Sequence, residues 1–103
     1  MRFYRLENLI NLHDGYRREF KIDQSQLLLI QELGELYLIE AFCPHRGHAL
    51  ADATVHGDAI RCPLHGYVFA LRDGAVQIAS EEPCRALRRY DVVYRNTDVG
   101  VML

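Results

Sequence analysis

Two short stretches of the chain each combine a cysteine, a proline and a histidine. The first contains Cys43-Pro44-His45 and the second Cys62-Pro63-Leu64-His65. Thiolates and imidazoles so close together are typical metal ligands, and two such pairs can share one centre only if the fold brings them together. The spacing is compatible with a structural zinc, a mononuclear iron or an iron–sulfur cluster.

The composition predicts a single soluble domain over residues 1–103, since 11.9 kDa suffices for one core but not for two. A net charge of −2 argues against a nucleic-acid partner. We find neither an apolar run of membrane-spanning length nor the apolar segment of a secretory signal, and so expect a cytoplasmic protein with no membrane partner. In that compartment, three cysteines point to metal binding or redox chemistry rather than disulfides.

Short segments rich in β-forming residues alternate with turn signals along the chain, which predicts an all-β, antiparallel sandwich or barrel. Gly or Asn beside Asp marks most of these turns, as in Asp14-Gly15 and Asp73-Gly74. The predicted strands cover residues 2–6, 17–22, 26–31, 35–42, 54–56, 59–61, 68–71, 87–95 and 99–103, with a single helical turn within residues 6–12. Each Cys/His pair follows a predicted strand and enters a glycine-containing loop, so the two loops can meet at one end of the β-scaffold.

The two stretches "CPHRGH" and "CPLHG" together resemble the cluster-binding loops of Rieske [2Fe–2S] proteins, in which Cys-x-His precedes Cys-x-x-His. The following "GYVFALRDG" is similar to the usual continuation in that family. The resemblance extends over the whole chain. It implies a Rieske-type antiparallel β-sandwich with a small cluster-binding subdomain formed by two loops, at about residues 42–49 and 61–67.

The resemblance further implies one Rieske-type [2Fe–2S] cluster held by Cys43, His45, Cys62 and His65. The two cysteines would bind the inner iron, and the two histidines would bind the outer iron, which takes the electron. Neutral imidazoles leave the oxidised assembly uncharged, whereas four thiolates would make it negative. An electron is therefore added more easily, which places Rieske potentials above those of plant-type ferredoxins.

Within the Rieske range, the resemblance points to a low potential. High-potential members carry a disulfide beside the cluster, and His48 and Leu64 occupy those two positions here. The same members place a Ser and a Tyr hydroxyl near the cluster, where this chain has Tyr67 and Phe69. Fewer donors to the sulfurs lower the potential, so we predict a value of about −150 mV. The spare Cys84 is expected to be structural or incidental, and His48 to be exposed to solvent or to face a partner.

The resemblance implies an electron carrier and not an enzyme. Such ferredoxins pass single electrons from a flavin-dependent ferredoxin reductase to a terminal oxygenase, commonly one that hydroxylates aromatic rings, through small, transient contacts. No histidine follows His65, so the chain lacks a 2-His-1-carboxylate iron site after the cluster loops. One alternative is the Rieske-like small subunit of an assimilatory nitrite reductase, although many of those lack the ligands. Another is a zinc-stabilised interaction module, which mixed Cys/His pairs fit poorly.

Overall fold

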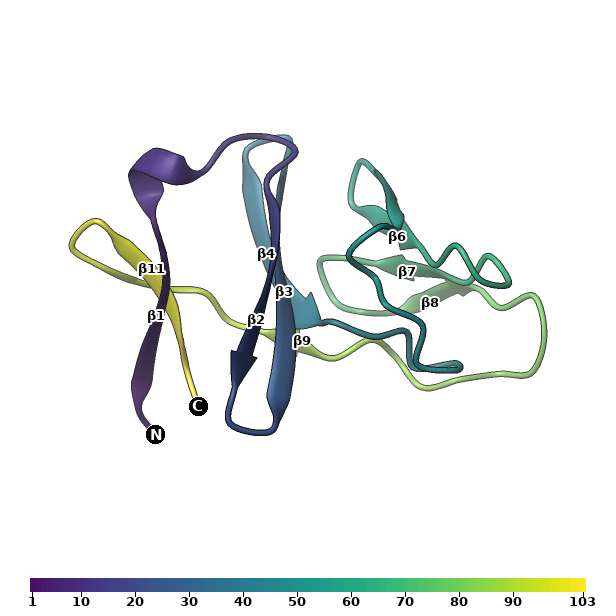
Figure 1. Ribbon diagram of the computed structural model, residues 1–103. Helices are drawn as coiled ribbons and strands as arrows, with labels where there is room; N and C mark the ends of the chain where they lie inside the picture. Colours follow the sequence, from purple (N-terminus) through teal and green to yellow (C-terminus); the bar gives the residue numbers. More distant parts are fainter.

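The computed structural model describes residues 1–103 as three antiparallel sheets and one 3₁₀ turn (Figure 1). The first sheet has the order β1-β11-β10, the second β2-β3-β4-β9 and the third β5-β6-β7-β8. The bounds are β1 Phe3–Asn8, η1 Leu9–Asn11, β2 Arg17–Ile22, β3 Ser25–Glu32, β4 Glu35–Glu40, β5 Thr54–His56, β6 Ala59–Arg61, β7 Val68–Ala70, β8 Val76–Ile78, β9 Arg89–Tyr90, β10 Val93–Arg95 and β11 Asp98–Met102. None of these elements is a helix long and apolar enough to cross a membrane.

The central strand β3 separates two hydrophobic cores. Its side chains alternate between the two faces of the sheet, as in any strand. Leu27 and Leu29 enter the core shared with β1 and β11, while Leu28 and Ile30 enter the core shared with β6 and β7. All four are almost completely buried. The unbroken apolar run in the sequence is therefore explained by a strand that is covered on both faces.

Two arginines of the central sheet bind main-chain carbonyls of the segments around the third sheet. Arg17 of β2 donates from Nη1 to the carbonyl of Ala51, at 3.0 Å, and to the carbonyl of Ala53. Arg89 of β9 donates from Nε to the carbonyl of Leu71 at 2.9 Å. These charge-assisted bonds supplement the apolar contact between the two layers.

The carboxylate of Glu7, in β1, is buried on the side of the fold away from the third sheet. Glu7 is 7 % exposed and accepts hydrogen bonds from Asn11 Nδ2 at 2.9 Å, the Asn8 backbone N–H at 2.9 Å and the Tyr16 hydroxyl at 2.7 Å. These donors, that of Asn11 first, stabilise the charged form and lower the pKa of Glu7 from 4.5 to about 2. The network joins β1, η1 and Tyr16, the residue before β2.

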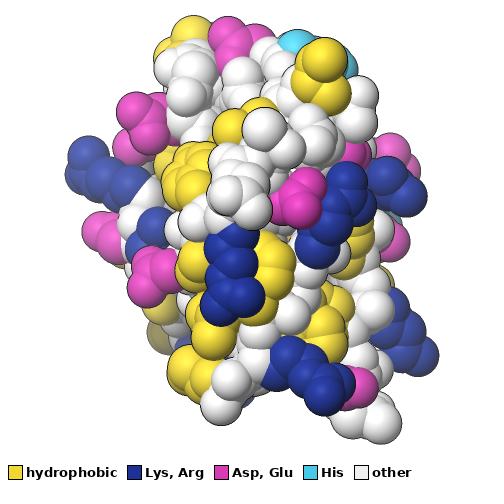
Figure 2. Space-filling model, turned by 90° about the vertical axis from the view of Figure 1, so that its left-hand side faces the viewer, with side chains coloured by type: hydrophobic (Ala, Val, Ile, Leu, Met, Phe, Trp, Pro, Cys, Tyr) yellow, Lys and Arg dark blue, Asp and Glu magenta, His cyan; other side chains and the backbone are white.

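The end of the molecule that carries β1 and β11 mixes charges of both signs with apolar atoms. Figure 2 views the molecule from this side, and its Lys and Arg side chains are interspersed with Asp and Glu. Arg95 lies over the ring of Phe3, at 4.3 Å from its centroid, which covers part of the apolar surface. This face therefore has no continuous basic surface of the kind that a nucleic acid binds.

The predicted all-β architecture is confirmed, and the predicted strands at residues 17–22, 54–56 and 59–61 match β2, β5 and β6. The strand predicted at residues 35–42 ends at Glu40, because Phe42 instead pairs with Ala49 in an isolated bridge. The strand predicted at residues 87–95 is wrong as a single element. It is divided into β9 and β10, because the chain passes from the central sheet to the first sheet between them. Strand β8 was not predicted.

Candidate metal centre

The first Cys/His loop leaves the end of β4 and folds back on itself. The Cys43 N–H donates to the His48 carbonyl at 2.8 Å, and the Gly47 N–H donates to the Cys43 carbonyl at 2.7 Å. The Phe42–Ala49 bridge closes the base of the loop. Gly47 has a φ of 74°, which an L-residue adopts only under strain, so the tight return depends on glycine.

The second loop joins β6 to β7 and is closed in a similar way. The Cys62 N–H donates to the Tyr67 carbonyl at 2.8 Å. Two consecutive residues reverse the chain in the left-handed region, His65 with a φ of 69° and Gly66 with a φ of 68°. A left-handed conformation at a non-glycine residue is uncommon and often marks a functional constraint. Here it accompanies one of the four predicted ligands.

The cysteines of the two loops lie together at the edge of the hydrophobic core. Cys43 and Cys62 are only 2 % and 1 % exposed, and both thiols are free. Burial raises the pKa of the Cys62 thiol, and contact with the Cys43 side chain raises it further. Two neighbouring buried thiols gain thiolate character when a metal supplies positive charge, which is what an iron-binding site requires.

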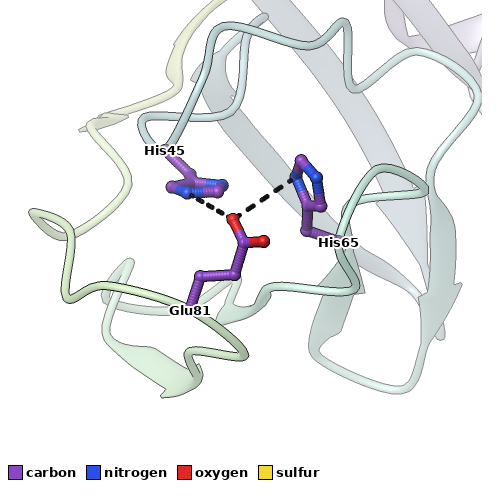
Figure 3. Close-up of side chains that lie close together, drawn as sticks. All are labelled: His45, His65 and Glu81. Atoms are coloured by element: carbon purple, nitrogen blue, oxygen red, sulfur yellow. Dashed lines mark ion pairs between the residues drawn. The ribbon is translucent and has the colours of Figure 1, made fainter.

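The histidines of the two loops lie together as well, as Figure 3 shows. The ring centroids of His45 and His65 are 5.3 Å apart, with the rings at 77° to one another. The His45 side chain is 2 % exposed, whereas that of His65 is 33 % exposed. The structure thus pairs thiol with thiol and imidazole with imidazole. This donor set, two thiolates and two neutral imidazoles from two loops, fits a [2Fe–2S] cluster.

A third segment, residues 79–83, lies against both loops. Ser80 Oγ donates to the His65 carbonyl, and the Tyr67 hydroxyl donates to the Glu82 carbonyl. Glu81 Oε1 lies 3.3 Å from His45 Nε2 and 3.9 Å from His65 Nδ1, the two ion pairs drawn in Figure 3.

Of the two glutamates, Glu82 has the better geometry for a hydrogen bond with His45. Its Oε1 accepts a hydrogen bond from His45 Nε2 at 3.1 Å and one from Arg46 Nη2 at 3.3 Å. The pKa of the Glu82 carboxyl is lowered, first by a bond to its own backbone N–H and then by His45. Arg46 is therefore paired with a carboxylate of its own chain.

His48 and Cys84, which were expected to have no ligand role, lie outside the group of two thiols and two imidazoles. His48 is exposed, as predicted. Cys84 is half-buried and packs against the core that contains Cys43. Burial raises the pKa of the Cys84 thiol, so it is less reactive than a free surface thiol.

The four-stranded sheet β5-β6-β7-β8 supports the two loops. Ile60 of β6 and Phe69 of β7 are fully buried in the same core as Cys43 and Cys62. The loops are therefore held by a packed layer, with the thiols on the core side.

Comparison with known proteins agrees with this geometry. The family model of the Rieske [2Fe-2S] domain matches residues 3–91. The chain therefore belongs to the Rieske [2Fe–2S] domain family, and its cofactor is one Rieske-type [2Fe–2S] cluster.

Solved ferredoxins match the chain over nearly their whole length. The ferredoxin of carbazole 1,9a-dioxygenase from Nocardioides aromaticivorans IC177 is 29% identical, with a TM-score of 0.81 and coverage of 96% of this chain and 95% of that one. A Sphingomonas yanoikuyae B1 ferredoxin has the same fold, with a TM-score of 0.82, 24% identity and 97% coverage of both chains.

The curated relatives are much longer proteins. Cholesterol 7-desaturase nvd of Xenopus laevis is 48% identical over 52 residues, which are 48% of this chain and 12% of that protein. The mouse apoptosis-inducing factor 3 is 30% identical over 67 residues, which are 65% of this chain and 11% of that protein. The chain spans about a tenth of the length of these relatives.

Proposed function

We propose that Cys43, Cys62, His45 and His65 bind the cluster, with the cysteines on the buried iron and the histidines on the iron nearer the surface. The observation that carries this assignment is the pairing of two adjacent buried thiols with two adjacent imidazoles at one end of the fold. When bound, the cluster accepts and releases one electron. The protein's own residues hold it, exclude water from the thiol side and leave the imidazole side near solvent.

We further propose that the protein is an electron carrier of an oxygenase system, and not itself an enzyme. Its 29% identical relative, matched over 95% of its length, is the ferredoxin of a dioxygenase. On this basis a terminal oxygenase, of the aromatic-ring-hydroxylating kind, takes the electron, and a flavin-dependent ferredoxin reductase supplies it. A nitrite reductase subunit is less well supported, because this chain keeps all four predicted ligands and its full-length structural relatives are ferredoxins.

The surface around His65 is suited to a transient partner. His65 has a third of its side chain exposed, and the neighbouring Leu64 is 42% exposed. An exposed imidazole beside a small apolar side chain allows close approach without a large buried area, as expected of electron-transfer contacts. We infer that partners dock here, so that the electron crosses through His65.

A low reduction potential agrees with the environment of Tyr67 and Phe69. The Tyr67 hydroxyl donates to the Glu82 carbonyl, so it is not available to a cluster sulfur, and Phe69 has no hydroxyl. A cluster with few hydrogen-bond donors to its sulfurs is harder to reduce. We therefore retain the prediction of a potential at the low end of the Rieske range.

The test is an EPR spectrum of the purified protein after reduction with dithionite, together with iron and zinc assays. The expected result is the EPR signal of a reduced Rieske cluster and two irons per chain. A colourless, EPR-silent protein with one zinc would instead support the interaction module. Stopped-flow oxidation of the reduced protein by a ring-hydroxylating oxygenase then tests the proposed pathway.

A further inference from the structure

The imidazole of His45 is restrained from two directions. One face of its ring stacks on Tyr67, with centroids 4.1 Å apart and an interplanar angle of 18°. Its Nε2 edge lies 3.1 Å from Glu82 Oε1. The Tyr67 hydroxyl in turn donates to the Glu82 carbonyl. His45, Tyr67 and Glu82 therefore form a closed set of contacts, which we name the His45 clamp.

The other predicted imidazole lacks such a clamp. The Nδ1 atom of His65 lies 3.9 Å from Glu81, too far for a hydrogen bond, and its ring is 33 % exposed. The hydrogen bond between His65 and the third segment is made by the His65 main chain, with Ser80. The two loops, similar in sequence, therefore present two histidines with different surroundings.

We propose, resting on the proposed function above, that Glu82 is a positioning residue that orients His45 and lowers the reduction potential of the cluster. A carboxylate can only accept, so His45 carries its proton on Nε2 and keeps Nδ1 for iron. A ligating imidazole that donates its other N–H to a carboxylate is fixed in one tautomer and is a stronger ligand.

Both effects of Glu82 have the same sign. Its negative charge disfavours an added electron, and a more strongly donating imidazole favours ferric over ferrous iron. Arg46, at 3.3 Å from the same carboxylate oxygen, offsets part of the charge and leaves the hydrogen bond to His45 in place. Removal of the Glu82 carboxylate should therefore raise the midpoint potential.

The hydroxyl of Tyr67 provides a test that leaves every charge unchanged. A tyrosine that donates to a cluster sulfur raises the potential, so its replacement by phenylalanine would lower it. Here the hydroxyl holds the main chain of Glu82, and the ring that stacks on His45 remains in the variant. The clamp therefore predicts that Tyr67→Phe raises the potential, because a looser Glu82 binds His45 less well.

The experiment measures midpoint potentials of Glu82→Gln, Tyr67→Phe and Glu81→Gln by redox titration followed by visible circular dichroism. Glu81→Gln is the matched control, because it removes an equal charge 3.3 Å from the same nitrogen without a hydrogen bond of good geometry. We expect the potential to rise in Glu82→Gln and Tyr67→Phe, and to rise less in Glu81→Gln. Cluster loss to an iron chelator should also be faster in Glu82→Gln than in Glu81→Gln.

Equal shifts in Glu81→Gln and Glu82→Gln would overturn the clamp, since the effect would then be one of charge alone. A lower potential in Tyr67→Phe would overturn it too. If Glu82→Gln fails to retain its cluster, Tyr67→Phe decides the question by the sign of its shift. Iron content and EPR of the unmodified protein separate these results from a failure of the proposed function, which would show as an absence of the cluster.

Discussion

Arg17 should control how long the cluster is retained, although it lies outside both cluster loops. Its guanidinium donates to the carbonyls of Ala51 and Ala53, just after the first loop. The first loop must move away from the second for the cluster to leave. Replacement by methionine keeps much of the aliphatic length and removes both hydrogen bonds, so the central sheet loses one of its ties to this loop.

The expected size of the effect follows from the two bonds. Hydrogen bonds from a charged donor contribute about 1.5–3 kcal/mol each, but here one nitrogen supplies both and the site is only partly buried. We therefore assign about 2 kcal/mol to the pair after allowance for solvent. If both bonds break before the cluster is released, Arg17→Met accelerates release by about 30-fold.

The assay follows the loss of visible absorption when the oxidised protein is mixed with an excess of iron chelator. Arg18→Met is the matched control, because it removes the same charge from the next residue, which points to the other face of β2. Arg18 is 63% exposed and lies 3.6 Å from Glu7, a distance beyond that of a normal hydrogen bond and remote from the cluster loops. Equal release rates in the two variants would refute the role assigned to Arg17.

Three further perturbations have definite expected outcomes. Because the pKa of Glu7 is lowered from 4.5 to about 2, its contribution to stability is present above pH 4.5 and is lost as the pH falls toward 2; parallel denaturant titrations should show the advantage over Glu7→Gln shrinking in that window. Gly74→Ala should abolish soluble folded protein, since a Cβ would lie 2.0 Å from the Leu87 carbonyl oxygen. The control Gly57→Ala, where a Cβ meets no atom within 4 Å, should only lower the melting temperature slightly. His65→Cys adds a thiolate charge, so a redox titration should find a lower midpoint potential, and an unchanged one would contradict the charge argument.

The parts of the fold that were predictable are those encoded by local pattern. The apolar run of β3 and the turn at Gly34 specify a hairpin on their own, and β3 to β4 pairs in full register. The Cys/His pairs predicted a candidate metal centre, because thiolates and imidazoles so closely spaced are typical metal ligands. Long-range geometry was needed only to place the two loops beside one another.

The parts that were missed depend on contacts between distant segments. Glu82 is an exposed acidic residue in a loop, and nothing in its neighbours indicates that His45, far away in the sequence, will contact it. Strand β8 has only three residues at a sheet edge, although the turn signal at Asp73-Gly74 could have predicted it as the partner of β7. The division of residues 87–95 between two sheets has only a weak local signal, since Asp91 is disfavoured in strands but neither Gly nor Pro marks a turn there.

The different spacing of the two pairs accounts for the different surroundings of the two imidazoles. Both loops begin with a cysteine anchored in the core, Cys43 at 2 % exposure and Cys62 at 1 %. The first loop reaches its histidine after one residue, and His45 remains beneath the third segment, against Tyr67. The second loop contains the additional Leu64 and turns through the left-handed conformation of His65, whose side chain remains a third exposed. One inserted residue thus separates a histidine that is stacked on Tyr67 and hydrogen-bonded to Glu82 from one with a third of its side chain exposed.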